Sequence, residues 1–95
     1  MAYEWHALKA TSNLKKHGVS FEEAETVLEN LLTDVQPDFK HSVGEARFLA
    51  IGMSAQGRVL VVSFSERAGA IRIISAREAT RRERKDYESQ SDFTG

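Results

Sequence analysis

The spacing of hydrophobic residues predicts two helices in the first third of the chain. Residues 8–17 contain no glycine or proline, end at Gly18, and carry Lys, Lys and His in their last turn. Such a stop, with cations beside the last carbonyls, is typical of a helix C-terminus. Ser20 and Glu23 then form a capping-box pattern, and apolar residues at helical spacing follow. We therefore expect a second helix from Ser20 to about Leu32.

Alternating and β-branched residues predict three strands in the second half of the chain, at residues 47–53, 58–65 and 70–74. The segments between them, residues 54–57 and 67–69, have the composition of tight turns. Because strands joined by such short turns are antiparallel, the pattern predicts an antiparallel meander.

A second capping-box pattern, Ser75 with Glu78, predicts that a last helix begins there and continues to about Glu88. Near the N-terminus, residues 3–5 form a further short strand in one interpretation of the pattern. The C-terminal residues 89–95 are polar, which predicts a flexible tail.

This order of elements predicts an α+β fold. We expect a small antiparallel sheet of three to four strands, with two N-terminal helices and one C-terminal helix packed on one of its faces. The length of 95 residues corresponds to one domain, which we place at residues 1–88.

Composition excludes several classes of protein. The chain has no cysteine, so it has no disulfide scaffold, thiolate zinc site or cysteine nucleophile. Its longest strictly apolar run, Val59–Val62, is far shorter than the roughly 20 residues that span a bilayer. No secretory signal pattern is visible at the N-terminus. We therefore expect a cytoplasmic protein without a membrane partner.

The net charge of −1 conceals an uneven distribution. Residues 44–77 carry five arginines and two glutamates, whereas residues 1–43 carry four lysines and seven acidic residues. Arginine has a planar group suited to phosphate, and a basic patch on one face is typical of nucleic-acid binding. The alternative is an arginine-rich sheet face that is simply solvated.

Three sequence blocks resemble, in the same order, the signatures of the BrnT toxins. The opening block is Trp5 and Lys9 followed by N-L-K-K-H-G-V-S-F-E-E-A from Asn13. The central block is G-E-A-R with I-G at residues 44–52. The closing block is R-I-I-S-A-R-E-A from Arg72, followed by E-R and a tyrosine. The resemblance extends from about Tyr3 to Glu88.

The resemblance implies a RelE-like fold and an endoribonuclease toxin of a type II toxin–antitoxin system, which inhibits growth by cleaving RNA without a metal or other cofactor. It implies a BrnA-like ribbon-helix-helix antitoxin as partner, in a hetero-oligomer of two toxins with two antitoxins. Operator DNA would be bound only through the antitoxin.

Two features depart from that pattern. His6 follows the tryptophan where the family usually has an acidic residue, and the chain is slightly acidic overall. Two other functions therefore stay open. One is a catalytically inactive module that binds the antitoxin as a corepressor, and the other is a nucleic-acid binder without a neutralising partner.

RNA cleavage by the 2′-hydroxyl needs a base, an acid and cations around the phosphate. We assign this chemistry to Lys16, His17, Arg67 and Arg77. His17 can transfer protons near neutral pH, although it and Lys16 can instead face the last carbonyls of their helix. Arg67 lies in a predicted turn, free to project. Arg77 lies at a predicted helix start, whose free N–H groups could share a phosphate with it.

Five further residues are candidates for RNA binding: Arg47, Arg72, Trp5, Glu45 and Tyr87. Each has a structural alternative. Arg47 and Arg72 can form ion pairs with Glu45 or with another glutamate of the sheet. Trp5 can close the core instead of stacking on a base, and Tyr87 can be buried on the last helix.

The three histidines, His6, His17 and His41, are not at the spacing of a metal site. We therefore expect no bound metal.

Overall fold

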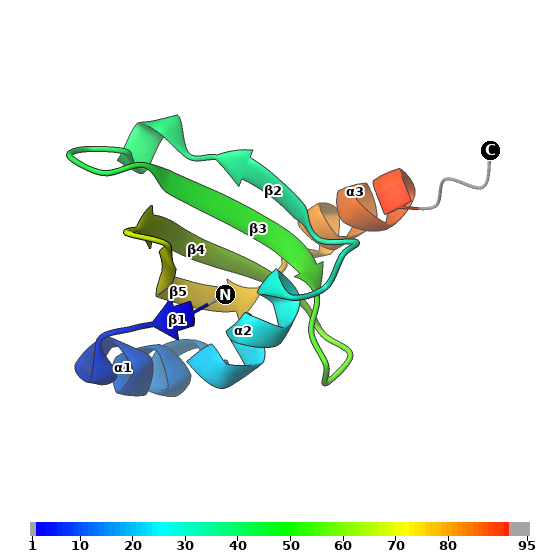
Figure 1. The fold of residues 1–95 in the computed structure, drawn as a ribbon. Coiled ribbons are helices and arrows are strands. Elements are labelled where there is room, and N and C mark those ends of the chain that lie inside the picture. Colours follow the sequence, from blue (N-terminus) through cyan, green and yellow to red (C-terminus); the bar gives the residue numbers. More distant parts are fainter. Residues whose placement is uncertain (1, 92–95) are drawn as a thin grey trace.

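The computed structural model describes residues 2–91 and has an α+β architecture (Figure 1). In chain order the elements are β1 (Ala2–Glu4), α1 (Ala7–His17), α2 (Phe21–Leu28), β2 (Asp34–Pro37), the 3-10 turn η1 (Phe39–His41), β3 (Arg47–Met53), β4 (Val59–Arg67), β5 (Ala70–Glu78) and α3 (Arg81–Ser91).

The sheet has five strands in the order β1-β5-β4-β3-β2 and is mixed, so the prediction of a purely antiparallel sheet with three to four strands is wrong. β1 pairs with β5 in parallel, with Tyr3 opposite Ile71. β2 pairs antiparallel with β3. The sequence of β2, Asp-Val-Gln-Pro, has a low β propensity. Pro37 is tolerated because β2 lies at an edge of the sheet.

The two long strands β4 and β5 form a hairpin around a two-residue turn. Ala68 and Gly69 both have positive φ, 48° and 83°, as a type I′ turn requires. The register shifts within the hairpin, because Ser63 is opposite Ser75 whereas Phe64 is opposite Ile73. One extra residue of β5 is accommodated there, and such a bulge changes the direction in which nearby side chains point.

Both predicted N-terminal helices are present, but the second is shorter than expected. Gly18 ends α1 in the left-handed conformation, with φ 70°, as predicted. Ser20 Oγ accepts the Glu23 N–H at 3.0 Å and so caps α2. The helix ends at Leu28, and Leu31 is 99% exposed in the following turn.

The last helix begins later than predicted. Ser75 and Glu78 belong to β5, which stays paired with β4 up to Glu78 opposite Leu60. The capping box that is used is Thr80 with Glu83: Glu83 N–H donates to Thr80 Oγ1 at 3.1 Å, and Thr80 N–H donates to Glu83 Oε1 at 2.8 Å. The helix continues to Ser91, so residues 89–91 are helical; residues 92–95 of the predicted tail lie outside the described residues.

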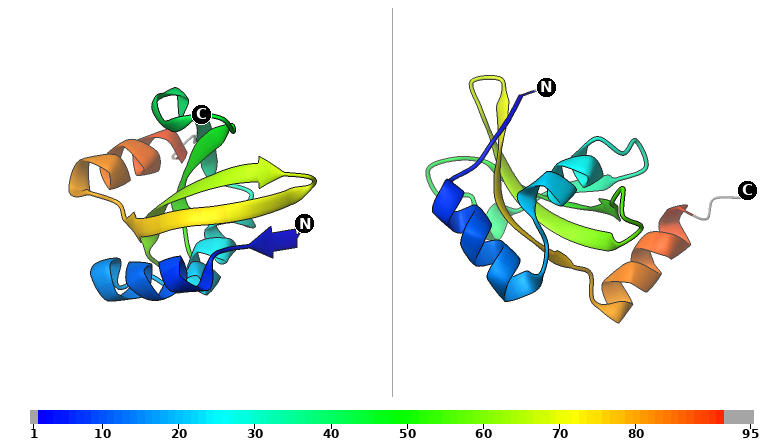
Figure 2. Two further views of the ribbon diagram at one scale, coloured as in Figure 1. Left: turned by 90° about the vertical axis from the view of Figure 1, so that its left-hand side faces the viewer. Right: turned by 90° about the horizontal axis from the view of Figure 1, so that it is seen from below.

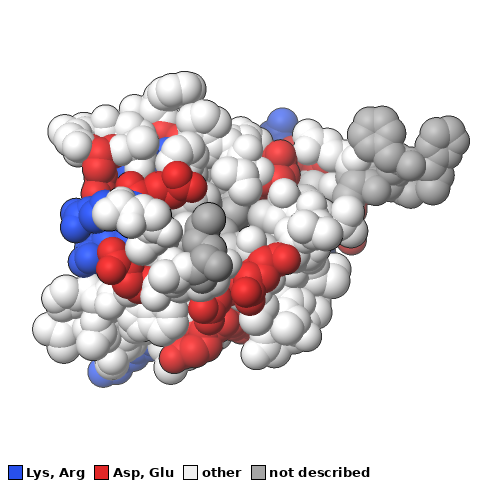
Figure 3. All heavy atoms as spheres, in the orientation of Figure 1, with Lys and Arg blue, Asp and Glu red and all other residues white. Residues whose placement is uncertain are grey.

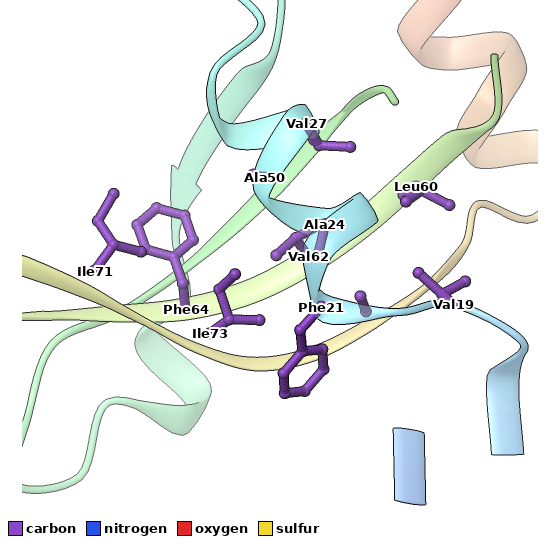
Figure 4. Packing of buried hydrophobic residues seen from close by; sticks show 11 residues of the cluster. Val19, Phe21, Ala24, Val27, Ala50, Leu60, Val62, Phe64, Ile71 and Ile73 are labelled. Atoms are coloured by element: carbon purple, nitrogen blue, oxygen red, sulfur yellow. The ribbon is translucent and has the colours of Figure 1, made fainter. Parts of the chain in front are cut away.

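The helices lie on both sides of the sheet, not on one face as expected. α1 and α2 lie together on one side, and α3 lies on the other (Figure 2). The core forms between α2 and the sheet (Figure 4). Its members are Val19, Phe21, Ala24, Val27, Ala50, Leu60, Val62, Phe64, Ile71, Ile73 and Ala76. Among the described side chains of α3, Tyr87 alone is buried, so this helix leaves most of its side of the sheet open.

The amide of Asn13 joins α1 to the sheet. β1 pairs with β5 only up to Arg72, so the outer edge of β5 needs other partners beyond that point. Asn13 is buried; its Nδ2 donates to the carbonyls of Ala76 and Val19 at 2.8 and 2.9 Å, and its Oδ1 accepts the Ala76 N–H at 3.1 Å. The side chain therefore pairs with β5 as a peptide group of a strand would, and it holds α1 beside that edge.

A second buried polar group, Glu23, joins α2 to the β3–β4 turn. Its carboxylate accepts hydrogen bonds from Ser54 Oγ at 2.7 Å and from Arg58 Nε at 3.0 Å. The guanidinium of Arg58 lowers the pKa of Glu23, although burial acts in the opposite direction.

Candidate nucleic-acid interface

The side of the sheet that α3 leaves open carries a row of polar residues. Arg47 begins β3, and Leu49, two residues on, is opposite Ser63 of β4, which in turn is opposite Ser75 of β5. Arg77 follows two residues after Ser75, on the same side of its strand. The alternation of side chains along paired strands therefore places two arginines and two serines on one face.

The turn η1 closes one side of this face and forms a hollow of about 470 Å³. The residues lining it are Asp38, Lys40, His41, Arg47, Leu49, Ser63, Ile74, Ser75 and Arg77. The size is within the range of small-molecule sites, roughly 300–1,000 Å³. Two strands, β3 and β5, and the η1 loop thus contribute basic side chains to a single concave surface.

A second hollow of about 200 Å³ lies between α1 and β5. Lys9, Ser12, Asn13, Lys16, His17, Ile74 and Ser75 line it. The two hollows share Ile74 and Ser75, at the position of the β5 bulge. The structure therefore brings Lys16 and His17, which end α1, next to the hollow that contains Arg47 and Arg77.

The combined surface is basic. Within residues 2–91, Lys9, Lys16, Lys40 and Arg47 take part in no ion pair. By contrast, acidic side chains run along α2 in the view of Figure 3, and Lys and Arg appear chiefly at its margins. Acidic and basic side chains therefore lie on different parts of the surface, and unpaired cations remain around the two hollows although the net charge is slightly negative.

Arg77 is not at a helix start, contrary to the sequence-based expectation. It lies in β5 opposite Val61, and its guanidinium donates to both carboxylate oxygens of Glu83, at 2.7 and 3.0 Å. This pairing raises the pKa of Arg77 and, with the help of the Thr80 N–H, lowers the pKa of Glu83 to about 2. The first turn of α3 thereby orients Arg77 along the wall of the larger hollow.

Arg67 lies away from both hollows, at the end of the β4–β5 hairpin. It is exposed, and its Nε donates to Glu45 Oε2 at 3.2 Å. Glu45 thus pairs with Arg67, not with the arginines considered from the sequence. Arg72 instead lies 3.9 Å from the carboxylate of Glu4. The structure does not bring Arg67 together with Lys16 and His17.

The two aromatic candidates have packing partners. Trp5 is half-buried and meets Phe21 edge-on, with ring centroids 5.9 Å apart, on the core side of the sheet. Tyr87 is buried, and its hydroxyl donates to the Leu32 carbonyl at 3.4 Å, which ties α3 to the loop before β2. Both rings lie outside the two basic hollows.

The sequence-based selection missed Asp38, Lys40 and His41. His41 Nδ1 lies 2.8 Å from Asp38 Oδ2. The sequence pattern that could have indicated them is an Asp and a His three residues apart, because one tight turn brings two such side chains into contact. Their meeting with Arg47 and Arg77 depends on the loop folding back over the sheet.

Among residues 2–91, no three His, Asp or Glu side chains are grouped so that they could hold a metal ion. No helix in that range is long and apolar enough to cross a membrane.

The comparisons with known proteins agree with the sequence blocks. A family model described as "Ribonuclease toxin, BrnT, of type II toxin-antitoxin system" matches residues 5–83. The chain belongs to the BrnT family. The 1.1 Å crystal structure of the Brucella abortus ribonuclease toxin, BrnT, is similar with a TM-score of 0.67 and 26% identity. The match covers 85% of this chain and 100% of that one. The comparison with curated proteins found no significant match.

The predicted resemblance to BrnT toxins is therefore confirmed, and both hollows lie within the matched residues. Membership in a type II toxin–antitoxin family implies an antitoxin as partner.

Proposed function

We propose that the chain is an endoribonuclease toxin that cleaves single-stranded RNA on the open face of the sheet, without a metal. The observation that carries this proposal is the pair of adjoining hollows, in which Lys16 and His17 meet Arg47 and Arg77 across Ser75. Lys16 and Arg47 have no acidic partner and can attract the phosphodiester backbone, and an imidazole beside them can transfer protons. Family membership supplies the reaction class.

In this proposal the phosphate lies at Ser75, between the two hollows. Arg47 and Arg77 stabilise the charge that develops on the phosphoryl oxygens, and Lys16 contacts the backbone from the other side. His17 is within reach of the same position and transfers a proton. Arg67 and Arg72 contact RNA outside the reacting phosphate, from the end of the hairpin.

We also propose that a BrnA-like ribbon-helix-helix antitoxin neutralises the toxin in an assembly of two toxins with two antitoxins, and that operator DNA is bound through the antitoxin. The edge of the sheet at β2 supports a protein partner. Large apolar side chains around it are exposed: Leu31, Leu32, Val35, Phe39 and Val43. Exposed apolar side chains concentrated in one segment of the chain are typical of a protein interface.

The direct test is expression of the chain alone in a bacterium, followed by mapping of new RNA 5′ ends. Growth arrest with discrete new ends, relieved by a co-expressed antitoxin, is the expected result. Purified protein in a chelating buffer should cleave RNA but leave the 2′-deoxy analogue intact. Soluble, folded protein that binds antitoxin yet leaves RNA uncut would contradict the proposal and favour an inactive binding module.

Site variants sharpen this test. Arg47→Ala and Lys16→Ala should each reduce cleavage at least tenfold without a change in circular dichroism. Lys15→Ala is the matched control, because Lys15 is an exposed neighbour on α1 that lines neither hollow. An equal effect of Lys15→Ala and Lys16→Ala would mean that only general charge attraction is at work.

A further inference from the structure

The turn η1 presents a histidine whose orientation is set by a carboxylate. His41 Nδ1 lies 2.8 Å from Asp38 Oδ2, and the two side chains differ sharply in exposure, 58% for His41 and 12% for Asp38. An ionised carboxylate only accepts hydrogen bonds, so it selects the ring form that carries its proton on Nδ1. The Nε2 atom of the neutral imidazole is then left with a free lone pair.

Backbone groups and the Ser42 hydroxyl hold this turn against the start of β3. Asp38 N–H donates to the Arg47 carbonyl at 2.8 Å, and Ser42 Oγ donates to the Asp38 carbonyl at 2.7 Å. The Arg47 N–H in turn donates to Ser42 Oγ at 3.0 Å. The position of His41 relative to Arg47 is therefore determined by a closed set of hydrogen bonds.

The imidazole lines the larger hollow, together with Lys40, Arg47 and Arg77. These three cations and the carboxylate of Asp38 are the charged groups that share the hollow with His41, and they come from η1, β3 and β5. A phosphate bound by the cations would bring its ribose to the same surface. This arrangement of a base with its positioning carboxylate beside anion-binding arginines follows the general pattern of acid–base sites.

We propose that His41 is the general base of RNA cleavage and that Asp38 is its positioning residue. The proposal rests on the proposed ribonuclease function and adds a role to it. Nε2 of His41 takes the proton of the ribose 2′-hydroxyl while the 2′-oxygen forms a bond to phosphorus. The bond from phosphorus to the 5′-oxygen breaks, and that oxygen takes a proton from His17 in the adjoining hollow. The products are a 2′,3′-cyclic phosphate and a 5′-hydroxyl end.

The test compares purified wild-type protein with His41→Gln on a short RNA across a range of pH. General-base catalysis is typically worth about 10²–10⁴-fold in rate, so kcat should fall at least 100-fold while KM changes little. The rise of kcat with pH that follows deprotonation of the base should disappear in the variant. Asp38→Asn should lower kcat by a smaller factor and keep that rise, because the base itself is still present.

His6→Gln is the matched control, since His6 is exposed at the start of α1 and lines neither hollow. It should retain wild-type kcat. Equal thermal midpoints for His41→Gln and wild type will exclude unfolding, and the exposed ring makes this variant well tolerated. A His41→Gln protein that cleaves within threefold of wild type with an unchanged pH profile overturns the base assignment alone. A folded wild type that leaves RNA uncut overturns both this inference and the ribonuclease proposal.

Discussion

The substitution Asn13→Asp tests how the edge of β5 is completed. The change keeps the size and shape of the side chain, and the remaining oxygen can still accept the Ala76 N–H. The two bonds donated by Nδ2, at 2.8 Å to the Ala76 carbonyl and 2.9 Å to the Val19 carbonyl, are lost. A carboxylate would then face two carbonyl oxygens in a site where the side chain is only 7% exposed.

The expected loss of stability follows from the two carbonyl oxygens, of Ala76 and Val19, that are left without a donor. Each buried polar group that loses its partner costs about 1–3 kcal/mol, so the expected loss is about 3 kcal/mol at neutral pH. A domain of this length is typically stable by only about 5–15 kcal/mol, so the loss is a large fraction of the total. The deficit relative to wild type should shrink at low pH, because a protonated carboxyl can donate one of the two lost bonds.

The measurement is urea unfolding followed by circular dichroism and by the fluorescence of Trp5, the single tryptophan of the chain. With an m-value of about 1 kcal/mol/M, the midpoint should fall by about 3 M. Ser12→Asp adds the same charge one residue earlier at an exposed position and should change stability by less than about 0.5 kcal/mol. Equal midpoints for the two variants at pH 7 would refute the argument, since charge on α1 and not the lost pairing with β5 would then explain the effect.

Three further predictions concern other contacts. A Cβ added at Gly52 would lie 2.1 Å from Thr33 Oγ1 and 3.1 Å from the Thr33 Cα, so Gly52→Ala should cost about 1–3 kcal/mol; an unchanged thermal midpoint would contradict the close packing. Arg58→Met removes the main partner of a buried carboxylate and should destabilise by about 3 kcal/mol at pH 7. Its unfolding free energy should approach that of wild type as the pH falls and the carboxyl protonates, and a deficit independent of pH would argue against this cause. For Glu83, an NMR titration should give a pKa of about 2, and Arg77→Gln should move it back towards 4.5. Because the folded-state pKa is lowered, the ion pair contributes to stability above pH 4.5 and loses that contribution as the pH falls towards 2.

Two of the helices could be placed from local signals because their ends are determined by neighbouring residues. Gly18 supplies a left-handed stop at little steric cost, and Ser20 satisfies a free N–H of the next turn. The last helix shows the limit of such signals. Two capping-box patterns lie near the start of this helix, at Ser75 and at Thr80. The second is used because β5 continues to pair with β4 beyond the first.

The edge strand β2 was not predicted, whereas the strand offered at residues 3–5 is present one residue earlier as β1. β2 has few apolar residues and ends in Pro37, and β1 has only three residues. Neither has a strong local preference for the extended state. Each is a strand because a neighbouring strand offers backbone partners, a contribution that comes from residues distant in sequence.

The same division applies to the candidate site. The chemical inventory is visible in the sequence: an arginine-rich segment at residues 44–77, a Lys-Lys-His end to the first helix, and the blocks that mark the BrnT family. Which of these groups share a surface depends on the way the chain folds. The fold brings Lys16 and His17 beside Arg77 and places His41, with the carboxylate of Asp38, in the same hollow as Arg77. It places Arg67 elsewhere, at the end of the hairpin. The physical reason is that caps and side-chain chemistry depend on adjacent residues, whereas strand pairing, the bulge in β5 and the fold of the η1 loop depend on contacts between distant segments.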